Sequence, residues 1–230
     1  MKYLNYLFLA FVLAFPLFAQ EFPQTAFRLK YERKDSEGII TGYGTAFSVD
    51  LTKYIIYAKD LKRHYLITAT HNVFRNGHYV GVTQIEYKDK WIPIKDMLVM
   101  DIDRDICILE IDEDLPTAKL AEKDCKMNDK VTMDASPKGV PLKTFEGSVV
   151  ARFWGGFKTW VNISFDHGCS GAPLYNKKHE IVGIALSGIP KKGGSEGEMD
   201  ETTGMFAPLC VLEDFIDTYF HPAGHVEEQK

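Results

Sequence analysis

The sequence has little cysteine, no excess of positive charge and few long apolar runs, and each shortage excludes a class of protein. Four cysteines in 230 residues, with no Cys-x-x-Cys pair, are too few for a small disulfide scaffold and do not indicate a zinc ribbon. The formal net charge of -5 argues against nucleic acid as a general partner, because no cationic excess is available to displace counterions. After the amino terminus, no apolar run approaches the roughly 20 residues that a membrane-spanning helix needs.

The remaining composition is that of an ordinary folded domain. Hydrophobic residues make up 45% of the chain and charged residues 26%, which excludes a largely disordered or fibrous protein. A chain of 230 residues suits one large domain or a domain of two lobes with a substantial core.

The amino terminus has the layout of a secretory signal peptide. Lys2 precedes an apolar run over residues 7–18, and the small Ala19 follows that run. The run is too short to span a bilayer, and Pro16 interrupts it. We therefore expect a signal peptide over residues 1–19 and a soluble mature chain, 20–230, that is secreted or periplasmic and has no membrane contact after cleavage. That compartment permits disulfides, but the sequence does not choose among the three pairings of Cys107, Cys125, Cys169 and Cys210.

Most of the mature chain has the pattern of short strands, rich in Val, Ile, Thr and aromatic residues and separated by turn-forming residues. About a dozen strands at regular spacing indicate antiparallel barrels or sandwiches, in an all-β fold. A polar stretch at 112–129 separates a first lobe, about 26–112, from a second, about 129–208, and one amphipathic helix follows at about 211–220. The expected strands are Phe27–Tyr31, Ile39–Val49, Tyr65–Ala69, Tyr79–Tyr87, Trp91–Met100, Ile106–Ile111, Lys130–Asp134, Gly147–Phe153, Lys158–Ile163, Glu180–Leu186 and Gly204–Ala207.

Three local patterns, in the order His, Asp, Ser, carry residues suited to nucleophilic catalysis. His71 follows the strand-like YLITAT, Asp105 directly precedes the apolar run ICILEI, and Ser170 lies within FDHGCSGAPL. A serine hydroxyl needs a base to take its proton, an imidazole can act as that base, and a buried carboxylate fixes the imidazole tautomer. The glycines around Ser170 permit a tight turn in which the amides of Gly168 and Ser170 form an oxyanion hole.

These patterns resemble those of the trypsin/chymotrypsin-like serine protease superfamily. TATH is similar to its T-A-A-H motif, DICIL to D-[LI]-A-[LV]-L, and GCSGAPL to G-x-S-G-G-P-L. The resemblance extends over about residues 27–220 and is closest to compact bacterial exported members of the HtrA-like and glutamyl-endopeptidase-like type without a PDZ domain. It implies two six-stranded antiparallel β-barrels, with His71 and Asp105 from the first and Ser170 from the second in the cleft between them.

The resemblance further implies a serine endopeptidase that acts on proteins or peptides and needs neither a metal ion nor an organic cofactor. Its substrate pocket would be lined from about Ser164–His167 and Leu186–Ile189, with Ser164, His167 and Gly188 as the named candidates. Because Ser164, and not an acid, stands at the matching pocket base, we expect small or apolar side chains to be preferred over Lys or Arg. Two residues depart from the family pattern: Ala172 replaces a glycine, and Cys169 replaces an acid.

The sequence leaves several alternatives open. Asp101 and Asp103 compete with Asp105 as the acid that orients His71, and Asp103 is the first alternative. His64, His71 and His78 recur every seven residues, but a β sequence lies between them, so we expect no metal site. A protease-like protein that only binds other proteins, and an esterase, are the two alternative functions. The oligomeric state is unknown.

Overall fold

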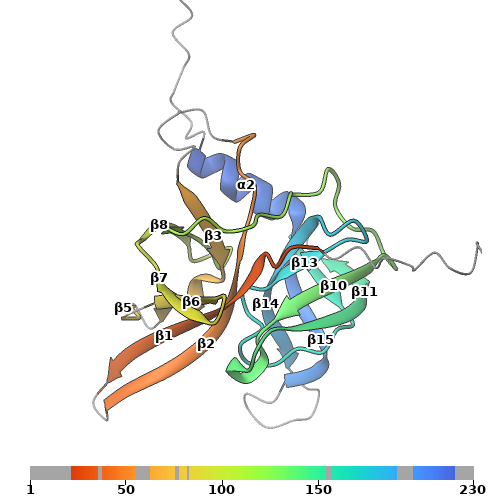
Figure 1. Cartoon of the computed structure of the whole chain (residues 1–230). Helices are drawn as coiled ribbons and strands as arrows, with labels where there is room; N and C mark the ends of the chain where they lie inside the picture. The colour runs from red at the N-terminus through yellow and green to blue at the C-terminus, as the bar shows by residue number, and fades with distance from the viewer. Residues whose placement is uncertain are drawn as a thin grey trace, which may run out of the picture.

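In the computed structural model, strands gather in two lobes and one helix lies across one end of both (Figure 1). The structure describes residues 22–35, 38–54, 63–75, 78–81, 83–153, 157–190 and 199–220, so the expected signal peptide lies outside the described residues. The mostly β architecture confirms the predicted fold class. Within the described residues, no helix is both long and apolar enough to cross a membrane.

The amino-terminal lobe is a seven-stranded antiparallel sheet that curls into a half-barrel. Its strand order is β7-β6-β1-β2-β3-β9-β8, and among the described residues no ladder joins β7 to β8. The predicted strand Trp91–Met100 is in fact two strands, because β7 pairs with β6 whereas β8 pairs with β9. The strands of this lobe are β1 (Ala26–Asp35), β2 (Gly38–Ser48), β3 (His64–Thr68), β6 (Thr83–Tyr87), β7 (Lys90–Pro93), β8 (Asp96–Asp101) and β9 (Ile106–Ile111), with the small pair β4 (Phe74–Arg75) and β5 (His78–Tyr79) beside them.

The carboxyl-terminal lobe is a closed six-stranded barrel, as predicted. Its strand order is β10-β11-β12-β15-β14-β13. The three-residue strand β13 was not among the expected strands, and it pairs with both β10 and β14 to close the barrel. The strands are β10 (Lys130–Ala135), β11 (Lys143–Phe153), β12 (Lys158–Val161), β13 (Pro173–Tyr175), β14 (Ile181–Pro190) and β15 (Met199–Pro208).

The hydrophobic core has two parts that meet across β9. All six residues of β9 are buried; Cys107 and Leu109 pack inside the first lobe, whereas Ile106 and Ile108 pack towards the second lobe and the helix. Burial of both faces explains why this strand is an unbroken apolar run. The polar connection at 112–129 joins the lobes through two isolated bridges, Val49 to Ala118 and Leu120 to Ile181.

The carboxyl-terminal helix α2 (Leu209–Phe220) begins two residues before the predicted start. Its buried residues recur at helical spacing and include Leu212, Phe215 and Ile216, so one face packs on the body of the protein. On the exposed face, Glu213 pairs with Lys53 at 3.1 Å and Asp214 pairs with Arg104. The helix therefore holds the two lobes together at the end that Figure 1 shows at the top.

All four cysteines are free, which settles the pairing that the sequence left open. Cys107, Cys125 and Cys169 are buried and Cys210 is exposed. Burial raises the pKa of the Cys125 thiol to about 12 and that of Cys169 to about 11, so both stay protonated near neutral pH. Within the described part of the chain, no cluster of three His, Cys, Asp or Glu side chains is placed to hold a metal ion.

Candidate active site

His71 and Asp105 form a hydrogen-bonded pair in the amino-terminal lobe. Strand β3 ends just before a short 3-10 helix, η2 (Thr70–Asn72), which carries His71. The distance from His71 Nδ1 to Asp105 Oδ2 is 2.7 Å, and the backbone N–H of His71 donates to Asp105 Oδ1 at 3.0 Å. The carboxylate thus fixes both the ring and the backbone of the histidine.

Asp105 occupies a turn that its neighbours stabilise. Its φ of 59° lies in the left-handed region, which Asp tolerates better than most residues. The Asp105 carbonyl accepts a hydrogen bond from the Thr70 amide at 3.1 Å, which ties this turn to η2. Asp103, the alternative acid, is exposed to solvent in the same turn. The structure therefore brings Asp105, and not Asp103, to His71.

Ser170 lies in a loop whose backbone requires two glycines. Gly168 and Gly171 have φ values of 93° and 84°. A Cβ atom would lie 2.3 Å from the Ser136 carbonyl oxygen at Gly168, and 2.1 Å from the Thr45 carbonyl oxygen at Gly171. No side chain fits either position, so this path of the loop depends on both glycines. The Ser170 hydroxyl donates to the Leu186 carbonyl at 3.1 Å.

The peptide units of this loop are held in a defined orientation. The His167 carbonyl accepts from the Lys138 amide at 2.5 Å, and the Cys169 carbonyl accepts from the Ala172 amide at 3.0 Å. In a trans peptide the N–H points opposite to its carbonyl, so these bonds also aim the amides of Gly168 and Ser170. Neither amide has a hydrogen-bond acceptor within the described ranges. Two N–H donors are therefore available beside the Ser170 hydroxyl.

Thr45 and Asn72 form a buried polar cluster in the first lobe, and this cluster donates hydrogen bonds to the loop that carries Ser170. The Thr45 amide donates to the Ser170 carbonyl at 2.9 Å, and its hydroxyl donates to the Gly168 carbonyl at 2.8 Å. Asn72 Nδ2 also donates to the Ser170 carbonyl, at 2.8 Å. Both side chains are almost fully buried. Sequence analysis did not identify this cluster, because Thr45 and Asn72 lie about 100 residues or more before the loop that they contact.

A cavity of about 470 Å³ lies between the lobes and is lined by residues of both. His71, Asp105, Gly168 and Ser170 all line it. Of the three residues expected in the substrate pocket, His167 also lines the cavity, whereas Ser164 and Gly188 do not. The other lining residues are Tyr31, Thr41, Gly42, Tyr43, Asn72, Lys138, Gly139, Phe165, Leu186 and Ser187.

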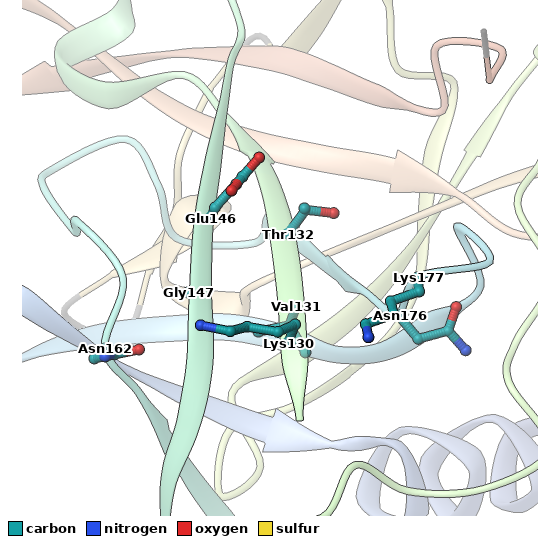
Figure 2. Close-up of a pocket in the computed structure, with 8 residues that line it drawn as sticks. All are labelled: Lys130, Val131, Thr132, Glu146, Gly147, Asn162, Asn176 and Lys177. Atoms are coloured by element: carbon teal, nitrogen blue, oxygen red, sulfur yellow. The ribbon is translucent and has the colours of Figure 1, made fainter. Parts of the chain in front are cut away.

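A second cavity, of about 560 Å³, lies on the carboxyl-terminal barrel (Figure 2). None of its lining residues is a histidine, serine or cysteine, so it offers no nucleophile with a neighbouring imidazole base. It is lined by Lys130, Val131, Thr132, Glu146, Gly147, Asn162, Asn176 and Lys177.

Comparison with known proteins finds proteases among the similar chains. Glutamyl endopeptidases of Staphylococcus epidermidis are 25% identical to the chain over 137 residues, which are 59% of this chain and 47% of theirs. The chain thus spans about half the length of these curated relatives.

Solved structures share the fold. The Rv3671c protease of M. tuberculosis in its active form matches with a TM-score of 0.64 and 14% identity, over 83% of this chain and 78% of that chain. Its inactive serine-to-alanine mutant matches with a TM-score of 0.60 at the same identity, over 83% of each chain. At this identity the likeness concerns the fold alone. The family model of the trypsin-like peptidase domain matches residues 44–184, more than half of the sequence, and the chain therefore belongs to the trypsin-like peptidase family.

Proposed function

We propose that the protein is a serine endopeptidase that hydrolyses peptide bonds through Ser170, His71 and Asp105. The observation that carries this proposal is the 2.7 Å contact between His71 Nδ1 and Asp105 Oδ2 in the cavity that Ser170 also lines. Membership of the trypsin-like peptidase family supports the same reaction class.

In the proposed mechanism, Asp105 keeps the proton of His71 on Nδ1, so that Nε2 is free to act as a base. Nε2 accepts the Ser170 proton as Oγ attacks the substrate carbonyl, and it then passes that proton to the leaving amine. The amides of Gly168 and Ser170 stabilise the tetrahedral oxyanion, each contributing about 3–4 kcal/mol. Water, activated in turn by His71, releases the acyl group from Ser170. No step requires a metal ion or an organic cofactor.

Hydrolysis of an unfolded protein tests the proposal. The purified protein is incubated with an unfolded protein and, separately, with an activated ester, and new amino termini are identified by mass spectrometry. We expect new termini, and we expect pretreatment with a fluorophosphonate to prevent them. Ester hydrolysis without new termini would identify an esterase, and a folded protein inactive on both substrates would identify a binding protein.

We propose further that the protein is exported, and that residues 20–230 form the mature protease domain. The leader-like residues 1–19, with Lys2 before an apolar run and Ala19 after it, support this. Proteins or peptides in that compartment would then be the substrates.

Thr45 is a positioning residue in this account, and Thr45→Val tests it. The change keeps the shape of the side chain but removes the hydroxyl that donates to the Gly168 carbonyl and accepts from the Ser136 amide. We expect kcat to fall about 10- to 100-fold with little change in KM, because the oxyanion donors lose alignment. Unfolding measurements should show a loss of about 1–3 kcal/mol from the unpaired groups.

Thr144→Val is the matched control for this prediction, since its hydroxyl bonds Asp134 on the exposed surface of the barrel. Its kcat should match that of the wild type. A Thr45→Val protein with unchanged kcat would show that the loop holds its shape without this hydroxyl.

A further inference from the structure

Phe165 lies five residues before Ser170 and forms part of the cavity wall beside it. Only 2% of its surface is exposed, so its ring lies behind the wall and does not project into the cavity. The ring packs edge-to-face with that of Phe206, on β15, at an interplanar angle of 89° and a centroid distance of 6.4 Å. The two rings thus occupy the interior of the barrel directly behind the serine loop.

Gly204, on β15, makes room for these rings. Gly188 and Gly204 lie opposite each other in the ladder between the two strands. A Cβ atom at Gly204 would lie 2.8 Å from ring atoms of both Phe165 and Phe206. The volume that the Gly204 side chain would take is therefore already filled by aromatic rings. A substrate side chain that enters beside Ser170 would therefore contact these packed rings, which leave little room for a large side chain.

Asp166, the residue after Phe165, is paired with a cation. Asp166 Oδ2 forms an ion pair with Lys138 Nζ at 2.9 Å, and Asp166 Oδ1 accepts from the His167 amide at 2.7 Å. Ser164, the residue expected at the pocket base, is exposed. Phe165 and Leu186 thus give the cavity an apolar wall, and among the described lining residues the one carboxylate is Asp105, which is paired with His71.

From this geometry we propose that Phe165 restricts the substrate residue on the acyl side of the cleaved bond to a small side chain, such as Gly, Ala or Ser. The proposal rests on the proposed endopeptidase function. Its basis is steric, because the ring is buried, packs against Phe206 and fills the space beside Gly204. Hydrophobic pockets discriminate a single methylene by about 10- to 200-fold, so a closed pocket should exclude Leu and Phe by at least about 100-fold.

A series of peptide anilides tests this proposal. The peptides share one sequence and differ only in the residue before the scissile bond, which is Gly, Ala, Leu, Phe, Glu or Lys. For the wild type we expect kcat/KM after Ala to exceed that after Leu or Phe by at least about 100-fold. Phe165→Ala should raise kcat/KM for Leu and Phe about 100-fold and change that for Ala by less than about tenfold.

Two further variants keep the test decisive. Phe165→Leu retains most of the buried volume and should show an intermediate gain if the larger change prevents folding. Phe145→Ala removes a partly buried ring from β11 that does not line the cavity, and its preference should match the wild type.

The outcomes separate this proposal from the proposed function. A wild type that reacts with a fluorophosphonate and cleaves efficiently after Leu, Phe, Glu or Lys would overturn the role of Phe165 alone. Unchanged preference in both folded Phe165 variants would do the same. If the folded wild type neither reacts with the probe nor cleaves any peptide, the endopeptidase function fails, and the proposal falls with it.

Discussion

Replacing Ser170 with alanine is expected to lower kcat by about a million-fold on any cleaved peptide. The change removes the only atom in the account that bonds covalently to substrate, while His71, Asp105 and the loop amides remain. The residue is buried, and within the described residues its hydroxyl makes a single hydrogen bond, to the Leu186 carbonyl, so the fold should persist. Initial rates and peptide affinity, measured on the same preparation, separate lost chemistry from lost binding.

Ser148→Ala is the control for this loss. Its hydroxyl bonds Asn162 on the barrel surface, far along the chain from the loop, and its removal should leave kcat unchanged. A Ser170→Ala protein that retains more than about one per cent of wild-type activity would show that another residue is the nucleophile.

The second large effect is expected for Asp105→Asn, which should lower kcat about ten-thousand-fold. Asn accepts the left-handed backbone of this position, so the turn before β9 should stay intact. The amide, however, offers His71 Nδ1 one acceptor fewer and no charge. The histidine then favours the wrong tautomer, and its protonated form loses its partner. Steady-state kinetics together with circular dichroism would measure the effect on a folded protein.

Asp103→Asn provides the matched control, because Asp103 is an exposed acid two residues away in the same turn. Its kcat should stay within about twofold of the wild type, as expected for a solvated surface charge. Equal losses of kcat in the two variants would show that His71 responds to the total negative charge of the turn and not to Asp105 in particular. A larger loss for Asp103→Asn would reassign the orienting acid.

Much of the fold and the core of the site follow from local sequence. The apolar run Ile106–Ile111 predicts a buried strand, and the structure places Asp105 at its start, against His71. The glycines around Ser170 predict a tight turn, which the positive φ values of Gly168 and Gly171 confirm. These features are predictable because each depends on neighbours in the chain.

The features that sequence analysis missed depend on contacts between distant segments. Thr45 meets the serine loop more than 120 residues away, and nothing local distinguishes it from other strand threonines. Phe165 falls within the range expected for the pocket, but its packing against Phe206, about 40 residues later, is not visible in the local sequence. Strand β13 has only three residues and begins with Pro173, so it lacks the length that reveals a strand. Pairing with β10 and β14, not propensity, makes it a strand.

The most direct test of the central claim, that Ser170 is an activated nucleophile, is mass spectrometry of the native protein after reaction with a fluorophosphonate. The account predicts one adduct per chain, on the peptide that contains Ser170, with none on Ser170→Ala and strongly slowed labelling on Asp105→Asn. A folded wild-type protein that stays unlabelled, or that carries its adduct on another residue, would contradict it.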